Sequence, residues 1–228
     1  NEIGKTLNGH GTPGISVKLS ALYPRYEFAQ REHCVPALTE KLSVLAHLAA
    51  EKKIAMTIDA EEVDRLETSL EIIENVFRDD TLGDWKGFGM AVQAYQKRCY
   101  ALIERLAEMA QGTGRRLSVR LVKGAYWDTE IKRAQERGLD SFPVFTRKAA
   151  TDVSYLACAA QLLGAREAIY PGFATHNAHT VAAVMELAAG RDVYWLRLDP
   201  TPASSEGPGS RDGGGVLATV DEALDYAQ

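Results

Sequence analysis

The apolar and polar positions of the chain follow two alternating periods. Short stretches with an apolar residue at every second position predict half-buried strands, and longer stretches with one at every third or fourth position predict helices. The predicted strands cover residues 14–20, 54–59, 88–94, 117–122, 169–175 and 192–198. The predicted helices cover residues 35–52 and 145–163, surround Leu70, Leu106 and Val184, and include a short one that begins near Asp128.

Strands that alternate with helices form a parallel sheet covered by helices, as an open doubly wound sheet or as a barrel. The predicted strands carry large apolar residues on one face, such as Met56 and Val119, and small or polar residues on the other, such as Thr57 and Ser118. A doubly wound sheet would be apolar on both faces. The predicted fold class is therefore α/β, an incomplete (βα)8 TIM-like barrel with about five or six of the eight strands.

The small, polar face of each strand ends in a residue that can carry chemistry: Lys18, Asp59, Gln93, Arg120 and His176. In barrel enzymes the carboxyl ends of the strands surround the active site. The same face also carries residues too small to fill a barrel interior: Gly89, Ala91, Ser118, Gly172 and Ala174. Because an empty interior is costly, we expect a large, partly planar cofactor at the mouth of the barrel.

Two stretches of the chain are suited to bind anions. Arg120 and Lys123 lie at the end of a strand, followed by the Gly124-Ala125 turn, whose backbone N–H groups can face an anion. Residues 146–148 (Thr-Arg-Lys) open a predicted helix, where two cations oppose the helix dipole unless an anion such as a pyrophosphate lies there. An ordinary solvated basic turn remains the alternative for this second stretch.

Other site chemistries have less support. Three carboxylates and two histidines near the predicted mouth suggest a divalent metal: Asp59, Glu61, Glu62, His176 and His179. Lys18 and Arg120 would share that mouth and repel a cation, so no metal is predicted. The sequence contains no glycine-rich dinucleotide fingerprint, phosphate-binding loop or serine-nucleophile elbow.

Composition narrows the class of protein. Acidic residues (31) outnumber basic ones (26), and the net charge of −5 argues against a nucleic-acid surface. We find no signal peptide and no apolar run of the ~20 residues that a membrane span needs. The three cysteines, Cys34, Cys99 and Cys158, are widely spaced, and we expect buried, reduced thiols of an intracellular protein.

Six segments carry a resemblance to a known family: residues 17–22, 58–62, 92–98, 120–128, 145–149 and 173–177. In order and spacing they resemble the proline dehydrogenase domain of the bifunctional bacterial proline-utilisation flavoenzymes, from about Gly14 to Gly190. The resemblance implies a distorted (βα)8 barrel that holds FAD non-covalently. It also implies oxidation of L-proline to 1-pyrroline-5-carboxylate, with electrons passed to a membrane quinone.

The same resemblance implies a cytoplasmic protein, with peripheral contact at the inner membrane face possible in the parent, whose second domain uses NAD to oxidise the product to glutamate. It implies roles for three catalytic residues. Lys18 would meet the proline carboxylate, Asp59 would belong to an ion-pair gate at the substrate pocket, and Arg120 would stabilise negative charge on the flavin. The implied FAD contacts are Gln93, Arg120, Val122, Lys123, Gly124, Ala125, Trp127, Thr146, Arg147, Lys148, Thr175, His176 and Asn177.

The chain also departs from the family pattern. The family has one more strand before Gly14 and, beyond Gly190, two strands and a last helix that carries an arginine pair. We find none of these C-terminal motifs here. We therefore predict a lead-in over 1–13, a partial barrel over 14–198, a disordered Gly/Ser/Pro-rich tail over 199–215 and a short helix over 216–228. We expect this chain alone to be inactive or weakly active. A metal-dependent barrel lyase or isomerase and a non-catalytic fragment remain the alternatives.

Overall fold

The computed structural model describes residues 14–188, 194–198 and 215–218. Its sheet contains β1 (Gly14–Val17), β2 (Ala55–Ile58), β3 (Phe88–Gln93), β4 (Leu117–Val122), β5 (Ile169–Phe173), β6 (Tyr194–Leu198) and β7 (Gly215–Ala218). Strands β1 to β6 are parallel neighbours in chain order, and β7 pairs antiparallel with β6. This order lacks the reversal that defines a doubly wound sheet, so the predicted barrel-type fold, present in part, is confirmed.

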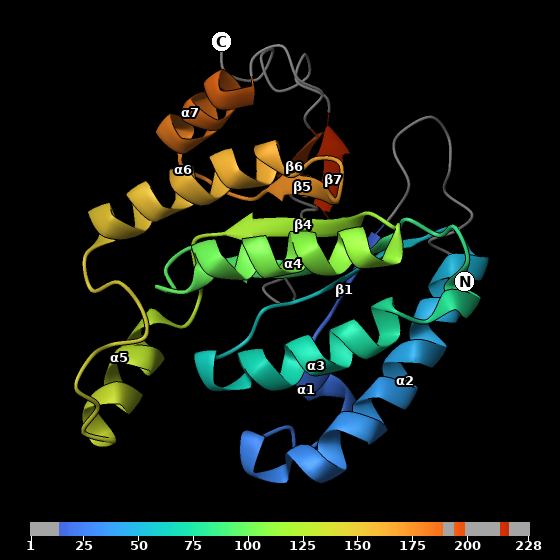
Figure 1. Ribbon diagram of the computed structural model, residues 1–228. Coiled ribbons are helices and arrows are strands. Elements are labelled where there is room, and N and C mark those ends of the chain that lie inside the picture. The colour runs from blue at the N-terminus through green and yellow to red at the C-terminus, as the bar shows by residue number, and fades with distance from the viewer. Residues whose placement is uncertain (1–13, 189–193, 199–214, 219–228) are drawn as a thin grey trace, which may run out of the picture.

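Helices alternate with the strands along the chain. They are α1 (Leu19–Leu22), α2 (Arg31–Glu51), α3 (Leu66–Phe77), α4 (Cys99–Thr113), α5 (Trp127–Glu136), α6 (Lys148–Gly164) and α7 (Ala178–Ala188). Short 3-10 turns form η2 (Phe28–Gln30), η3 (Val63–Arg65) and η4 (Asp80–Leu82). Figure 1 shows α2, α3, α4 and α6 along the same side of the sheet, whereas α5 stands apart beyond the tip of β4.

The core lies between the sheet and this helical layer. In β4, Leu117, Val119 and Leu121 are buried, while the residues between them face the other side and are partly exposed. This alternation confirms the predicted division of the strands into an apolar outer face and a polar inner face. Strand β3 is buried along its whole length, and a side chain on Gly89 would place its Cβ 2.5 Å from the Ser118 carbonyl oxygen. A glycine is therefore needed where β3 approaches β4.

Several predicted boundaries are wrong, among them the start of α2, which is Arg31 and not residue 35, and the end of β5, which is Phe173 and not residue 175. Strand β1 ends at Val17, not at residue 20, because α1 begins at Leu19. Helix α6 begins at Lys148, not at residue 145: the Phe145 N–H is bonded to the Tyr95 carbonyl, and Arg147 has extended backbone angles. Residues 215–218 form a strand where we predicted a tail and a helix, since pairing with β6 satisfies their backbone groups. The rest of the predicted tail and helix, and the lead-in over 1–13, lie outside the described residues.

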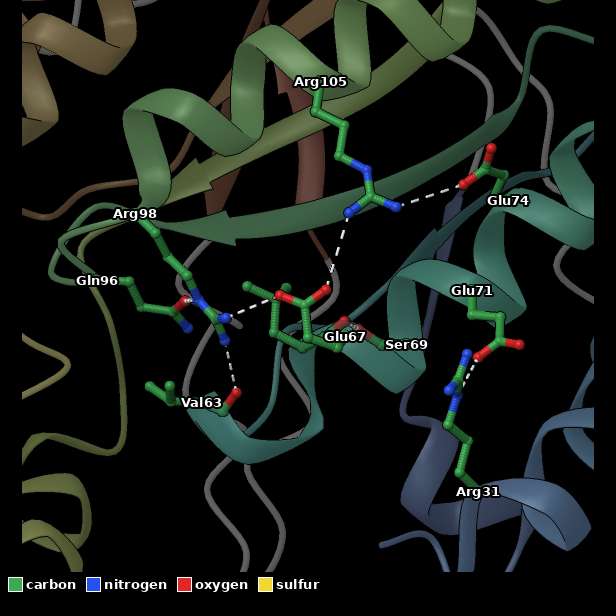
Figure 2. Close-up of polar contacts among 10 residues, drawn as sticks. Arg31, Val63, Glu67, Ser69, Glu71, Glu74, Gln96, Arg98 and Arg105 are labelled. Carbon is green, nitrogen blue, oxygen red and sulfur yellow. Dashed lines mark hydrogen bonds and ion pairs between the residues drawn. The ribbon is translucent and has the colours of Figure 1, made fainter. Parts of the chain in front are cut away.

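On the outer surface, charged pairs join neighbouring helices. Figure 2 shows Arg98, just before α4, and Arg105 of α4 reaching to carboxylates of α3. Arg98 Nη1 lies 2.9 Å from Glu67 Oε1, and its Nη2 donates to the Val63 carbonyl at 2.8 Å. Arg31 of α2 pairs with Glu71 of α3 at 2.6 Å. Exposed pairs of this kind contribute little to stability individually.

The three cysteines are buried, with exposed fractions of 0–1%, and none forms a disulfide. The predicted burial of the thiols is confirmed. Among the described residues, no helix is both long enough and apolar enough to cross a membrane.

Candidate active site

A cavity of about 830 Å³ opens where β1 to β5 reach their carboxyl ends. All five polar residues predicted at strand ends line it: Lys18, Asp59, Gln93, Arg120 and His176. So do seven of the further residues predicted from the resemblance: Val122, Lys123, Gly124, Ala125, Lys148, Thr175 and Asn177. The prediction that strand-end residues far apart in the sequence converge on one cavity is therefore confirmed.

Arg120 ties three strands together on the inner face of the sheet. Its Nη2 forms an ion pair with Asp59 Oδ1 after β2, and its Nη1 donates to Ser16 Oγ on β1 at 2.9 Å. The side chains of Arg120 and Asp59 are each 22% exposed, so the pair is only partly shielded from water. The guanidinium is thus held at the cavity wall with its charge partly balanced.

Gln93 shapes the next part of the cavity wall. It is 3% exposed, its amide nitrogen donates to the Glu61 carbonyl at 2.9 Å, and its amide oxygen accepts from Ala125 N–H at 3.3 Å. The side chain therefore connects the loop after β2 with the turn after β4. A buried amide with both ends bonded fixes the position of that turn.

The turn itself depends on Gly124. This residue has φ +141°, and an added Cβ would lie 2.5 Å from ring atoms of the buried Tyr95. The Tyr95 N–H also donates to the Lys123 carbonyl at 2.8 Å, which keeps the ring and the turn together. Only glycine fits such a conformation and approach.

A second cavity of about 390 Å³ adjoins the first. Its lining includes Tyr95, Trp127, Thr146 and Thr151, and it shares Lys123, Gly124 and Lys148 with the first cavity. The Trp127 indole N–H donates to the Phe145 carbonyl at 3.0 Å, which fixes the ring at this wall. Arg147 precedes α6, is exposed and lines neither cavity, so the structure does not bring it to the predicted site.

A carboxylate joins the two lysines at the shared wall. Asp152 Oδ1 lies 2.6 Å from Lys123 Nζ, and Asp152 Oδ2 lies 2.6 Å from Lys148 Nζ. Hydrogen bonds from Lys123 and then Lys148 lower the pKa of Asp152 below its ordinary value. Asp152 therefore carries its negative charge at neutral pH.

Comparison with known proteins identifies the family. Residues 2–196 match the family described as proline dehydrogenase. The chain belongs to the proline dehydrogenase family. It is 54% identical over 195 residues to the bifunctional protein PutA of Salmonella typhimurium, covering 84% of this chain and 15% of that protein. It is 50% identical over 182 residues to the bifunctional protein PutA of Rhizobium meliloti, covering 80% and 14%.

Solved structures of proline utilization A (PutA) share this fold. The structure of PutA with proline bound in remote sites matches with a TM-score of 0.80 at 55% identity, over 82% of this chain and 20% of that one. PutA from Bdellovibrio bacteriovorus, inactivated by N-propargylglycine, matches with a TM-score of 0.73 at 36% identity, over 76% of this chain and 18% of that one. The chain thus spans 14–15% of the length of these curated relatives.

The three carboxylates weighed for a metal site, Asp59, Glu61 and Glu62, are each paired with an arginine. Glu61 Oε1 accepts from the Ser20 N–H at 3.0 Å, and its Oε2 pairs with Arg65 at 2.7 Å. Glu62 also pairs with Arg65, at 3.0 Å. Within the described part of the chain, no group of three or more His, Cys, Asp or Glu side chains is placed to hold a metal ion.

After β5, the Asn177 side chain caps the N-terminus of α7. Asn177 Oδ1 accepts from Thr180 N–H at 2.9 Å at the start of α7. Thr175 Oγ1 accepts from Asn177 N–H at 3.2 Å, which shapes the turn. The cap fixes the segment that carries His176 at the cavity.

Sequence reasoning missed Ser16, Tyr126, Asp152 and Glu130. Tyr126 lines the first cavity but lies inside a motif from which only its neighbours were selected. Asp152 had a usable signal, because it lies four residues after Lys148 on one helix, a spacing that favours an ion pair. Glu130 had none, since its partner Val63 is 67 residues away.

Glu130 attaches α5 to the loop that follows β2. It is 3% exposed, and its Oε1 accepts from the Val63 backbone N–H at 2.8 Å. Burial raises the pKa of Glu130, and the carboxylates of Asp64 and Glu62 add to the effect. A raised carboxyl pKa means that ionisation disfavours the folded state at higher pH, a cost that disappears as pH falls below the ordinary glutamate range.

We therefore expect opposite effects from two substitutions of Glu130. Glu130→Ala leaves the buried Val63 N–H without an acceptor and should destabilise the fold by about 1–3 kcal/mol. Glu130→Gln keeps an acceptor and removes the charge, so it should be more stable than the parent at neutral pH, by a margin that shrinks as the pH is lowered. Urea unfolding at neutral and acid pH measures both effects. Equal destabilisation by the two variants at neutral pH would contradict this account.

Proposed function

We propose that this chain forms the flavin- and substrate-binding part of an enzyme that oxidises L-proline to 1-pyrroline-5-carboxylate in proline catabolism. The observation that carries the proposal is the convergence of Lys18, Asp59 and Arg120 with Gln93 and His176 at one barrel mouth. Family membership supports the reaction class, since the matched family is described as proline dehydrogenase.

The residues present fit FAD as the cofactor. Small side chains such as Ala91 and Ala174 leave the first cavity open for a planar ring, and the second cavity offers room for a longer arm. Lys123 and Lys148 lie at the wall between the cavities, where a diphosphate would need cations. The flavin, when bound, supplies the two-electron acceptor for the hydride of the substrate.

The chain's own residues position the substrate and polarise the site. The Lys18 ammonium lies at the mouth and would meet the proline carboxylate. Arg120, fixed by Asp59 and Ser16, would stabilise negative charge that develops at the flavin. Hydride transfer from a neutral amine needs no separate acid–base pair, so positioning is the main task of the protein.

The acceptor, location and remaining contacts complete the proposal. We infer a quinone as electron acceptor, a cytoplasmic location and peripheral contact with the inner membrane face. Gln93, Val122, Gly124, Ala125, Trp127, Thr146, Arg147, Lys148, Thr175, His176 and Asn177 are proposed with Arg120 and Lys123 as FAD contacts. These assignments rest on the family resemblance, and the geometry supports them for every residue except Arg147.

Proline-dependent reduction of a dye tests the proposal. The sample is a chimaera in which residues 14–188 of this chain replace the matching segment of the Salmonella typhimurium relative, loaded with FAD. We expect turnover with L-proline that survives treatment with a metal chelator. A folded, flavin-loaded chimaera without proline-dependent turnover would refute the proposal, and turnover abolished by the chelator would favour the metal-dependent alternative.

The second cavity predicts a preference between flavins. FMN lacks the adenosine arm, so only FAD can use the wall of Trp127, Thr146 and Lys148. Titration of the apo-chimaera with each flavin should show FAD bound more tightly, by about tenfold or more if one charge-assisted contact is gained. Equal affinities would remove the second cavity from the cofactor site.

A further inference from the structure

Asp152 pairs with the two lysines that the two cavities share. Its two carboxylate oxygens contact two different lysines, Lys123 and Lys148, each at 2.6 Å. Both lysines line both cavities. We propose that Asp152 is a positioning residue that holds the two ammonium groups side by side to receive the diphosphate of FAD. This inference rests on the proposed function.

The lysines need such a partner because they repel each other and have flexible side chains. The Lys148 side chain is 74% exposed and begins α6, so little packing restrains it. A carboxylate between two ammonium groups removes their repulsion and leaves one net positive charge. That remaining charge, already oriented, is available for an anion that passes from one cavity to the other.

A series of contacts anchors this arrangement to the sheet. Tyr155 is fully buried, and its hydroxyl donates to the Leu121 carbonyl of β4 at 3.3 Å. The Lys123 ammonium lies 5.9 Å from the centre of the Tyr155 ring, a cation–π distance. Asp152 then extends the connection from Lys123 to Lys148. The exposed lysine is thereby positioned by the rigid core.

If Asp152 had a different role, as a competitor of the bound anion, its substitution would change anion affinity in the opposite direction. If Asp152 merely competed with phosphate for the lysines, removing its charge would strengthen anion binding. If it positions them, removing the charge lets the ammonium groups separate, and anion binding weakens. The two roles are therefore distinguished by one substitution.

The test uses the 228-residue chain and its variants Asp152→Asn, Asp152→Glu and Asp84→Asn. Asp84 is exposed in the loop before β3, at the other end of the sheet, so Asp84→Asn makes the same charge change away from the cavities. Calorimetric titration with FAD, riboflavin and inorganic pyrophosphate separates the contribution of the flavin ring to binding from that of the diphosphate. Circular dichroism checks that each variant is folded.

We expect Asp152→Asn to weaken the binding of FAD and of pyrophosphate by about tenfold, a loss of about 1.4 kcal/mol of binding free energy. The affinity for riboflavin should not change. Asp152→Glu should recover most of the loss, and Asp84→Asn should match the parent. Equal weakening of riboflavin and FAD would indicate a structural role and overturn the proposal. Tighter pyrophosphate binding by Asp152→Asn would overturn it in favour of competition.

The test of Asp152 and the test of the proposed function can fail independently of each other. A chimaera that binds FAD but does not oxidise proline would refute the proposed function while the effect of Asp152→Asn on FAD remained measurable. If the parent chain binds pyrophosphate but no flavin, the change in pyrophosphate affinity caused by Asp152→Asn alone tests the positioning role of Asp152. If the parent chain binds neither FAD nor pyrophosphate, the proposal fails.

Discussion

Replacing Arg120 by methionine should slow proline oxidation by the chimaera about 10- to 150-fold, the rate equivalent of 1.5–3 kcal/mol for a lost charge-assisted contact. The substitution removes a cation from the cavity wall and leaves the Asp59 carboxylate there without this partner. Because the Arg120–Asp59 pair is partly exposed, its loss should lower the rate of proline oxidation more than the stability of the fold. Rapid mixing of the FAD-loaded protein with L-proline measures the rate.

Arg116 supplies the matched control. It lies just before the first residue of β4, at the end of the strand away from the cavity. There it donates to the Ile169 carbonyl at 3.1 Å and stacks on the Tyr170 ring. Arg116→Met should leave the rate of proline oxidation unchanged. If Arg120 and Asp59 act as a unit, combining Arg120→Met with Asp59→Asn should cost less than the sum of the single substitutions. An unchanged rate in Arg120→Met would exclude Arg120 from the chemistry.

Gly124→Ala should have the largest effect on the fold of the site. The φ of +141° is strained for alanine by about 1–3 kcal/mol, and the added Cβ would lie 2.5 Å from the Tyr95 ring. Tyr95 is 2% exposed and cannot move aside freely, so overpacking adds about 1–3 kcal/mol. The sum is a large fraction of the stability of an ordinary domain. We expect a much lower urea midpoint and loss of FAD binding.

Gly164→Ala is the corresponding control. Gly164 ends α6, has no atoms within 4 Å of an added Cβ and does not have a positive φ. Its replacement should leave the urea midpoint unchanged or slightly raised, since alanine favours helix. Equal stability of the two alanine variants would show that the turn tolerates a side chain and that Gly124 is not required.

The inner face of the sheet was predictable because it depends on local alternation. Side chains two residues apart point to the same face of a strand, so Arg120 and Ser118 share a face in any fold that keeps the strand. Parallel strands bring their carboxyl ends to one edge, so Lys18, Asp59 and Gln93 had to converge once the sheet formed. Residues 117–122 illustrate this: the predicted bounds and the predicted faces are both confirmed.

Features that depend on contacts between distant segments were not predictable. The start of α6 is set by the bond from Phe145 N–H to Tyr95, and the strand at residues 215–218 is set by pairing with β6. The reason for Gly124 is the Tyr95 ring, which lies 29 positions earlier in the chain. Local propensity contains none of this information, and tertiary contacts override it.

The central claim is that the cavity at the strand ends holds a flavin whose arm crosses to the second cavity. A crystal structure of the FAD-loaded chimaera tests it most directly. We predict the flavin ring beside Gln93, Arg120 and His176, with the diphosphate at Lys123 and Lys148. Flavin bound outside the barrel mouth, or an arm that does not contact either lysine, would contradict the account.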